Sequence, residues 1–349
     1  GSIYLTREVF RFDHCDDGNV RLFIGTKTNN IGYLSFKAHG KFEIPNSLYV
    51  RKERGHYYVS FCYEQGQPDR KLSTNEEHLA FLQGATREYL EEHTMGVDRG
   101  VAIPVCAGEQ TYDFTHSQKK NMSKADRYIK RLQRKLARQQ KGSNRRAKTK
   151  HRIAVHHAKK ANIRNDFAHK TSRLLVDSSA KIIVFEALRT ARMTRRPKAK
   201  QDEQGRFISN KAKQKAGLNK SILNVGWHVI ETYTYYKAYS SSKAVFKIPA
   251  PTTSQECAKC GHTHPDNRKT QALFVCGNCG NTDNADHNAS LVIKKRAINL
   301  ILDTGTVLSG DGVLRTQSDS GRGGNRKTGR AKSSTSSAQR SVKKEKLAA

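Results

Sequence analysis

The sequence predicts a mixed α/β protein preceded by a small β-rich domain. Residues 20–63 alternate apolar and polar side chains in short runs, as half-buried strands do. Two later apolar runs, at 94–103 and 182–185, are typical of buried strands, and segments with helical periodicity lie between them. Strands that alternate with helices are the pattern of an α/β fold.

The β-rich domain is expected over residues 1–70. Gly, Asn and Asp residues separate its strands and favour an antiparallel meander or a small barrel, with strands at 20–24, 31–36, 42–44 and 56–61. A helix over 75–92 follows, because Thr74 and Glu77 have the spacing of a capping box. The chain begins Gly1-Ser2 without a methionine, as a cloning scar or a truncated front end would.

The α/β domain is expected over residues 71–251. Its first strand lies in the segment 94–107, which also contains a turn. Its second strand follows a helix in the segment 171–188. After a polar stretch at 190–215, the pattern predicts a helix at 218–239 and a strand at 244–248.

The segment 119–170 is a strongly basic insertion between the first two strands. It holds 19 Lys and Arg residues against two acids, and its apolar residues Ile129, Leu132 and Leu136 recur at helical spacing. The sequence Lys141-Gly142-Ser143-Asn144 interrupts this spacing, so we expect a helical hairpin.

The C-terminal part contains a cysteine-rich module, a helix and a tail. The module occupies 252–284, and an amphipathic helix at about 287–302 lies in a final segment of the α/β domain, 285–303. Residues 304–349 are rich in Gly, Ser, Thr, Lys and Arg, and from 320 onwards there are nine basic residues and one acid. This composition predicts a disordered basic tail.

Overall charge points to a polyanionic partner. The chain of 349 residues has 64 Lys and Arg against 31 Asp and Glu, a net charge of +33, with a mean hydropathy of −0.76. A surplus of this size repels itself unless a polyanion neutralises it, and nucleic acid does so through its phosphates. No apolar stretch has the length of a membrane span and no signal peptide opens the chain, so a membrane or secreted protein is not expected.

The basic hairpin is the predicted nucleic-acid contact. A solvated helical surface is the alternative, but such surfaces usually mix both signs of charge. The candidate contacts on the hairpin are Lys130, Arg131, Arg134, Lys135, Arg138, Arg145 and Arg146.

Four of the seven cysteines form two Cys-x-x-Cys pairs, Cys257 with Cys260 and Cys276 with Cys279. Fifteen residues separate the pairs, which is the spacing of a four-cysteine zinc site with a closed, structural shell. An odd total of cysteines without a signal peptide disfavours a disulfide framework and favours a reducing compartment. Unmetallated cysteine is the alternative, and His262 or His264 are possible substitutes for a ligand.

Three acids stand at the ends of apolar strands or at a helix start, in a chain where acids are scarce: Asp98, Glu186 and Asp286. Buried carboxylates are costly unless they bind cations, and oxygen-only clusters suit Mg²⁺ or Mn²⁺. Each acid also has an ordinary explanation. Asp98 would belong to a turn, Glu186 would pair with Arg189, and Asp286 would cap a helix.

The order of motifs resembles that of TnpB proteins, the transposon-encoded RNA-guided nucleases related to Fanzor proteins and type V CRISPR effectors. The resemblance covers about residues 20–303 and rests on Gly96-Val97-Asp98-Arg99-Gly100, Val184-Phe185-Glu186-Ala187-Leu188, the segment Thr253 to Gly261, and Asp286-His287-Asn288-Ala289-Ser290. It implies a RuvC-like nuclease domain of ribonuclease H fold, split by the hairpin and the zinc module and preceded by a wedge-like barrel. Asp98, Glu186 and Asp286 match the three motif acids, which implies DNA hydrolysis with two Mg²⁺ or Mn²⁺ ions. The zinc module implies one structural Zn²⁺.

The resemblance also implies partners and a location. These are a guide RNA derived from the transposon end and a double-stranded DNA target, in the nucleoid of a prokaryotic cytoplasm and with no membrane. Family members usually carry a short basic-aromatic strand and a helical recognition segment before the barrel, and this chain enters the barrel almost directly. Two other functions therefore stay open: a non-cleaving RNA- or DNA-binding regulator, and an unguided ribonuclease H-like nuclease or transposase.

Overall fold

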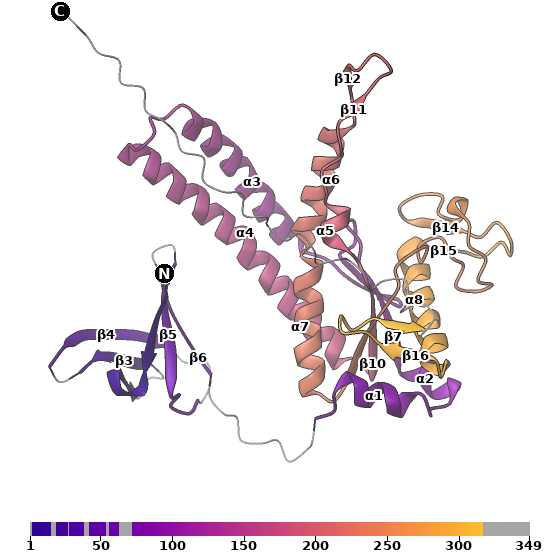
Figure 1. Cartoon of the computed structure of the whole chain (residues 1–349), viewed down its shortest axis with the longest axis horizontal. Coiled ribbons are helices and arrows are strands. Elements are labelled where there is room, and N and C mark those ends of the chain that lie inside the picture. The colour runs from indigo at the N-terminus through magenta and orange to yellow at the C-terminus, as the bar shows by residue number, and fades with distance from the viewer. Residues whose placement is uncertain are drawn as a thin grey trace, which may run out of the picture.

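The computed structural model describes residues 2–14, 19–26, 28–37, 42–53, 56–62 and 72–316. Figure 1 shows its central feature, a sheet with helices on both faces and a long helical hairpin that extends away from it. The predicted α/β class is confirmed in this coarse sense. No helix among the described residues combines the length and apolar character needed to cross a bilayer.

The N-terminal strands form two three-stranded antiparallel sheets. One sheet has the order β1-β5-β6 and the other β2-β3-β4, with bounds Ser2–Thr6 (β1), Phe10–His14 (β2), Asn19–Gly25 (β3), Asn30–Lys37 (β4), Ser47–Glu53 (β5) and His56–Phe61 (β6). The predicted strand at 42–44 is wrong, since these residues lead irregularly into β5. The inner faces share an apolar core, and a closed barrel stays a prediction.

The helix predicted at 75–92 is two helices, α1 (Asn75–Leu82) and α2 (Arg87–His93). The capping box of Thr74 and Glu77 is confirmed, with both reciprocal hydrogen bonds present. Thr86 starts the second helix by accepting a hydrogen bond from the Tyr89 amide at 3.2 Å. A second capping residue inside an apolar pattern therefore divided the predicted helix.

The sheet has the strand order β13-β10-β7-β8-β9. Its bounds are Thr94–Asp98 (β7), Val105–Ala107 (β8), Gln110–Tyr112 (β9), Ile182–Glu186 (β10) and Ala244–Ile248 (β13). Strands β7, β10 and β13 are parallel, whereas β8 and β9 continue antiparallel from β7. The predicted strand at 244–248 is confirmed, and the run at 94–103 ends as a strand at Asp98.

Side chains of β10 alternate between two apolar cores, one on each face of the sheet. Ile183 and Phe185 join the core that contains α4 (Asn144–Asp177), α6 (Ala212–Val225) and α7 (Trp227–Ser240). Ile182 and Val184 join the core that contains α1, α2 and α8 (Ala285–Leu302). Both faces are buried, which explains why β10 is a continuous apolar run rather than an alternating one.

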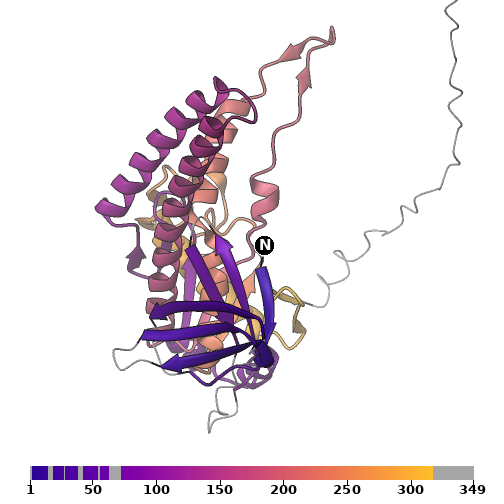
Figure 2. The same ribbon diagram turned by 90° about the vertical axis from the view of Figure 1, so that its left-hand side faces the viewer.

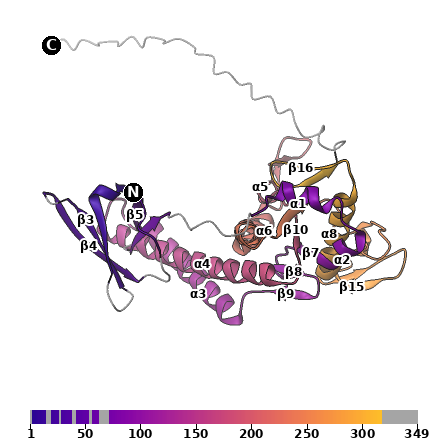
Figure 3. The same ribbon diagram turned by 90° about the horizontal axis from the view of Figure 1, so that it is seen from below.

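The basic insertion is a helical hairpin, as predicted. It consists of α3 (His116–Ala137) and α4 (Asn144–Asp177), which lie side by side in Figure 1 and Figure 3. The break falls at 138–143, where Ser143 begins α4 by accepting a hydrogen bond from the Arg146 amide at 3.3 Å. Lys160 of α4 donates to Asp126 of α3 at 2.7 Å and to Asn224 of α6 at 3.3 Å. Lys160 therefore connects both helices of the hairpin with α6.

The polar stretch after β10 contains a short helix and a small hairpin, seen projecting in Figure 2: α5 (Thr190–Met193), β11 (Lys200–Gln201) and β12 (Phe207–Ile208). The helix predicted at 218–239 is again two helices, α6 (Ala212–Val225) and α7 (Trp227–Ser240). Gly226 separates them with a φ of +78°, a left-handed conformation that glycine adopts without strain.

The C-terminal helix α8 (Ala285–Leu302) is followed by a hairpin of β16 (Thr306–Leu308) and β17 (Leu314–Thr316). The prediction that a disordered tail begins at 304 is therefore wrong for residues 304–316. Leu314 is fully buried against α8, and the Lys247 amide of β13 donates to the Gly312 carbonyl at 2.9 Å. The apolar residues of this hairpin are too few to stand out in a polar sequence, and residues 317–349 lie outside the described part.

Gly96 allows α8 to pack directly on β7. A Cβ atom at this position would lie 2.1 Å from the Ser290 carbonyl oxygen and 2.7 Å from the Lys294 amide nitrogen, both backbone atoms of α8. Any side chain here must push the helix away from the strand.

We therefore expect Gly96→Ala to lower the free energy of unfolding by about 3 kcal/mol, at the upper end of ordinary overpacking. Urea denaturation measures this loss. The control is Gly217→Ala on α6, where a Cβ meets nothing within 4 Å and alanine favours the helix. Equal stability of the two variants would contradict the close packing of α8 on β7.

Candidate active site and metal centre

Two of the three predicted acids meet at one edge of the sheet. Asp98 is the last residue of β7 and Glu186 is the last residue of β10. The strands are parallel neighbours, with Phe185 opposite Val97, so their carboxyl ends lie together. This is the edge at which open α/β sheets usually place ligands.

Asp286 reaches the same edge from α8, of which it is the second residue. Asn284 is the capping residue, since its side chain accepts hydrogen bonds from the Asp286 amide at 2.9 Å and the His287 amide at 3.2 Å. The alternative explanation of Asp286 as the cap is therefore wrong. Figure 1 shows α8 alongside β7, which brings its first turn to the strand ends.

All three carboxylates are buried and electrostatically linked. The exposed fractions of Asp98, Glu186 and Asp286 are 9%, 6% and 4%. Burial, together with repulsion from the other two carboxylates, raises the pKa of Asp98 to about 7. Burial also raises the pKa of Glu186 and of Asp286. The acids thus form one cluster, although 88 and 100 residues separate them in the sequence.

Two side chains of the cysteine module compensate part of this charge. Thr253 donates a hydrogen bond to the Glu186 carboxylate. Arg268 donates to Asp286 Oδ1 at 3.1 Å, and its charge also lowers the pKa of Asp98 and Glu186. The expected alternative pair of Glu186 with Arg189 is not among the ion pairs of the described residues.

Arg99 is a further buried residue at this edge. Its guanidinium donates to the Glu186 backbone carbonyl and to Glu231 Oε2 at 2.7 Å, and Lys247 binds the other oxygen of Glu231 at 3.1 Å. Arg99 therefore holds the end of β10 through its backbone and leaves the Glu186 carboxylate to the cluster. The roles of Arg99, Thr253 and Arg268 could not be predicted from the sequence, because their spacing in the chain does not show which elements they bridge.

The carboxylate cluster has the chemistry of a divalent-cation site. Among the described residues, Arg268 is the cation that forms an ion pair with a carboxylate of the cluster. Arg99 and Arg296 also act on Glu186, but they are paired with Glu231 and Glu256, so the cluster keeps an excess of negative charge when it is ionised. Hard oxygen ligands of this kind suit Mg²⁺ or Mn²⁺. In the part of the chain that the structure describes, the cysteine quartet is the one group of His, Cys, Asp or Glu side chains whose ligand atoms converge as a metal-ligand set, and the three acids do not form such a set. Acids that do not converge on one point are compatible with two ions about 4 Å apart.

The cysteine quartet has the shape of a tetrahedral zinc site. The Sγ atoms of Cys257 and Cys279 are 3.7 Å apart, and those of Cys260 and Cys276 are 3.6 Å apart. Four Zn–S bonds of about 2.3 Å give tetrahedral edges of about 3.8 Å, which these two distances match, and all four Sγ atoms lie within 4.8 Å of one another. His262 and His264 are exposed and stack on each other outside the quartet. The predicted four-cysteine ligand set is confirmed as a cluster, with no open position.

Each cysteine pair sits on a tight turn. The Gly261 amide donates to the Cys257 carbonyl at 2.8 Å, and the Gly280 amide donates to the Cys276 carbonyl at 3.1 Å. Both glycines have positive φ, at +77° and +67°, a left-handed conformation that glycine adopts without strain.

A buried asparagine of α8 binds the backbone of the cysteine module. Asn288 accepts a hydrogen bond from the Ala258 amide at 3.0 Å and donates to the Glu256 carbonyl at 2.7 Å. Arg296 adds an ion pair to the Glu256 carboxylate, with Nε at 2.8 Å from Oε2. The module, which also contains β14 (Leu273–Val275) and β15 (Thr282–Asn284), is therefore held where Arg268 contacts the acids.

Most of the predicted contacts on the hairpin point to solvent. Lys130, Arg131, Arg134, Lys135, Arg138 and Arg145 are all exposed. Arg146 is only partly exposed, and its guanidinium donates to the Leu136 carbonyl and to the Gln139 carbonyl at 2.9 Å. Arg146 thus stabilises the C-terminal end of α3, where carbonyl groups lack helical partners.

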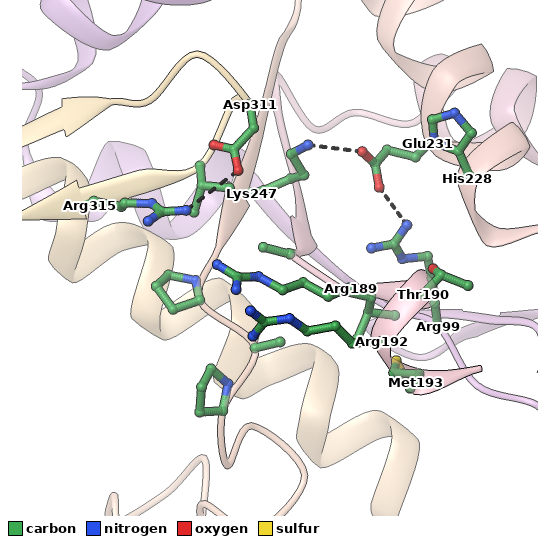
Figure 4. A pocket seen from close by; sticks show the side chains of 16 residues that line it. Arg99, Arg189, Thr190, Arg192, Met193, His228, Glu231, Lys247, Asp311 and Arg315 are labelled. Atoms are coloured by element: carbon green, nitrogen blue, oxygen red, sulfur yellow. Dashed lines mark hydrogen bonds and ion pairs between the residues drawn. The ribbon is translucent and has the colours of Figure 1, made fainter. Parts of the chain in front are cut away.

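A cavity of about 940 Å³ opens beside the carboxylate edge, and it is lined by residues 187–190, 192–193 and 249–251 together with side chains of α7, β13 and the C-terminal hairpin. Figure 4 shows Arg189 and Arg192 extended side by side into it, whereas Arg99 and Lys247 are paired with Glu231 and Arg315 with Asp311. Ala187, the next residue after Glu186, belongs to its lining. The two extended arginines give the cavity a surplus of positive charge next to the acids, which suits a phosphate backbone.

We expect Arg189→Gln/Arg192→Gln to weaken single-stranded DNA binding and to reduce the slope of log affinity against log salt by about 1.4. That value corresponds to two lost phosphate contacts at about 0.7 each. Fluorescence anisotropy over a KCl series measures it. Arg195→Gln/Arg196→Gln is the matched control, because it removes the same charge from exposed residues that do not line the cavity. Equal slopes for the two variants would contradict the assignment.

Comparison with known proteins supports the motif resemblance. A family model described as "Probable transposase" matches residues 60–196, and one described as "Cas12f1-like, TNB domain" matches residues 227–293. The chain is 36% identical over 277 residues to the Escherichia coli K12 protein named "Putative RNA-guided DNA endonuclease InsQ", covering 79% of this chain. The resemblance to the TnpB and Cas12f-type group is thereby confirmed.

Two further comparisons are more distant. The "CRISPR-associated endodeoxyribonuclease Cas12f1" of Sulfoacidibacillus thermotolerans is 27% identical over 263 residues, or 72% of this chain. A solved Cas12f1–sgRNA–target DNA complex aligns with a TM-score of 0.40 at 13% identity, over 85% of this chain and 67% of that chain. The present chain spans 61% of the length of the Escherichia coli relative and 53% of that of Cas12f1.

Proposed function

We propose that this chain, a relative of transposon-encoded nucleases, is an RNA-guided DNA endonuclease with a RuvC-like nuclease domain of ribonuclease H fold. The observation that carries the proposal is the convergence of Asp98, Glu186 and Asp286, buried, at one edge of a mixed sheet. All three positions keep the carboxylate of the family motif that they resemble. The names of the curated relatives agree with this activity.

Asp98, Glu186 and Asp286 would hold two Mg²⁺ or Mn²⁺ ions, whose chemistry when bound is activation of water and stabilisation of the leaving 3′ oxygen in phosphodiester hydrolysis. The chain's own side chains position the carboxylates. Thr253 fixes the Glu186 carboxylate by a hydrogen bond, and Arg99 fixes the end of its strand. Arg268 supplies positive charge at Asp286, beside the place where a scissile phosphate would lie.

The exposed basic residues of α3 and α4 and the cavity of Arg189 and Arg192 would hold the nucleic-acid backbone. A guide RNA would supply sequence choice by base pairing with one strand of a double-stranded DNA target, and the protein would contact mainly phosphates. This division explains a net charge of +33, with 64 Lys and Arg against 31 Asp and Glu.

The test is to purify the chain with its bound RNA, sequence that RNA, and add Mg²⁺ with a duplex that matches it. Cleavage of the matched duplex and not of a scrambled one is the expected result. Cleavage of both duplexes would identify an unguided ribonuclease H-like nuclease. Tight binding without cleavage would identify a non-cleaving regulator and would overturn the proposed activity.

A further inference from the structure

The outer face of the sheet β1-β5-β6 carries three exposed tyrosines. Tyr4, Tyr49 and Tyr58 have exposed fractions of 54%, 51% and 45%. The strand register places Tyr4 opposite Tyr49, and Tyr58 opposite Arg51. Because side chains alternate along a strand, this face is opposite to the one on which Leu48 and Val50 are buried.

The rings and the arginine are arranged as two neighbouring platforms. The ring centroids of Tyr4 and Tyr49 are 4.9 Å apart at an interplanar angle of 51°. The Arg51 guanidinium carbon lies 5.4 Å from the Tyr58 ring centroid, a cation–π distance. Tyr49 and Arg51 are two residues apart on β5, which is about 7 Å along the strand. Two flat ligands can therefore lie side by side on this face.

The composition of the face distinguishes between partners. Its remaining positions in the paired register are the hydroxyl residues Ser2, Thr6, Ser47 and Ser60, and the pair of Glu53 with His56 at the end of the sheet beyond Arg51 and Tyr58. Tyrosine and arginine are common in protein interfaces too, but the core of such an interface is usually more apolar, and the paired positions of this face include no aliphatic residue. Aromatic rings on an open sheet with nearby positive charge are the means by which proteins stack unpaired nucleobases.

We propose that this surface, Tyr4, Tyr49, Arg51 and Tyr58, binds unpaired bases of a single-stranded nucleic acid. Tyr4 with Tyr49 forms one stacking platform, and Tyr58 with Arg51 forms the other. A duplex does not fit the surface, because its bases are already stacked on one another. The chain as a whole, with a net charge of +33, repels a basic protein partner, whereas residues 1–70 carry only +2, so stacking rather than charge is expected to dominate at this face. The proposal is independent of nuclease activity, since base stacking here requires neither the carboxylates nor cleavage.

The test uses the full chain with Asp98→Ala, so that no probe is cut. The probes are single-stranded RNA and DNA 12-mers that contain 2-aminopurine, measured in about 0.5 M KCl to weaken phosphate contacts. We expect Tyr4→Ala/Tyr49→Ala/Tyr58→Ala to lower the affinity about 30-fold, as two lost stacking contacts would. The quenching of 2-aminopurine fluorescence should be lost as well, and the salt slope should stay unchanged because no charge is removed.

Two variants serve as controls. Tyr57→Ala removes an equally exposed tyrosine from β6, 55% exposed, whose side chain projects from the other face, and should bind as the parent does. Tyr4→Phe/Tyr49→Phe/Tyr58→Phe keeps the rings and should also bind. The affinities of the RNA and DNA probes then show which strand the surface prefers.

Three results would overturn the proposal. The first is that the triple alanine variant binds as tightly as Tyr57→Ala, which would leave a protein partner for this face. The second is that it loses affinity equally for an abasic 12-mer, which would implicate the phosphates. The third is that the triple phenylalanine variant is as weak as the alanine variant, which would assign binding to the hydroxyls. These binding measurements do not depend on cleavage, so they remain interpretable even if the chain shows no RNA-guided cleavage.

Discussion

Replacing Asp98 by Asn should reduce DNA cleavage at least about 1000-fold while nucleic-acid binding remains. The carboxylate ends β7 inside the cluster, and an amide of the same shape carries no charge for a divalent ion. Loss of about 4 kcal/mol of charge stabilisation corresponds to three powers of ten in rate. Single-turnover cleavage of the RNA-matched duplex in Mg²⁺, with binding followed in parallel, measures the separation.

The same variant should be more stable than the wild type when divalent ions are removed with EDTA. The pKa of Asp98 is raised to about 7 from its ordinary 3.8, so the folded protein holds a proton that the unfolded chain has already lost. Stability of the wild type therefore falls as the pH rises from about 4 to about 7. The asparagine variant has no ionisable group at this position and does not lose stability in this way. The melting temperature of the variant should therefore exceed that of the wild type by a margin that grows between pH 5 and pH 8.

Added Mn²⁺ should reverse this order. Binding to the ionised cluster stabilises the folded wild type, whereas the variant has lost a ligand and should respond weakly. The control is Asp303→Asn, an exposed acid just after the opposite end of α8 that should change neither cleavage nor the response to Mn²⁺. A variant that cleaves normally, or that melts below the wild type in EDTA at pH 8, would contradict the three-carboxylate site.

The acids of the site could be predicted from the sequence because each depends on a local pattern. Asp98 and Glu186 follow apolar strands, and Asp286 starts a helix, in a chain with few acids. Considered alone, each acid was better explained by its ordinary role in a turn, an ion pair or a helix cap than by a functional one. Only the parallel pairing of β7 with β10, and the close approach of α8 at Gly96, brings the three together.

Arg268 and Thr253 could not be predicted, because their roles depend on where the cysteine module is placed. Asn288 and Arg296 fix that placement through contacts with residues about 30 to 40 positions earlier, at Ala258 and Glu256. The cavity of Arg189 and Arg192 was missed for the same reason. Its walls come from α5, α7, β13 and the C-terminal hairpin, and no spacing within one segment indicates that they meet.

The errors in the predicted secondary structure have local causes. Periodicity continued across Gln83–Thr86 and across Gly226, so pairs of helices were predicted as single ones. The hairpin after Asp303 was predicted as disordered, because polar composition outweighs the few buried residues, such as Leu314, that attach it to the core. A short hairpin that packs on an existing core needs few apolar residues of its own. Its average composition is therefore as polar as that of a disordered segment.

The second large effect should come from Cys276→Ser, which removes a zinc ligand. We expect the zinc content of the purified protein to fall from one per chain to near zero. Among the described residues, the small apolar core at the module consists of two cysteines, Phe274 and Ala285 of α8, so we expect the metal to supply most of the module's stability. Zinc–thiolate sites contribute about 10 kcal/mol or more to folding, and the module should therefore unfold locally without the ion. Metal analysis and limited proteolysis within 252–284 measure both effects.

Loss of zinc should also reduce cleavage, although no carboxylate is changed. An unfolded module withdraws Thr253 from Glu186 and Arg268 from Asp286, so the acids lose their positioning partners. Cys62→Ser is the matched control, because Cys62 is an exposed free cysteine outside the quartet and should change neither zinc content nor rate. If Cys276→Ser lost its zinc and still cleaved at the wild-type rate, the module would not position the acids. The contacts of Thr253 and Arg268 with the carboxylates would then have no part in catalysis.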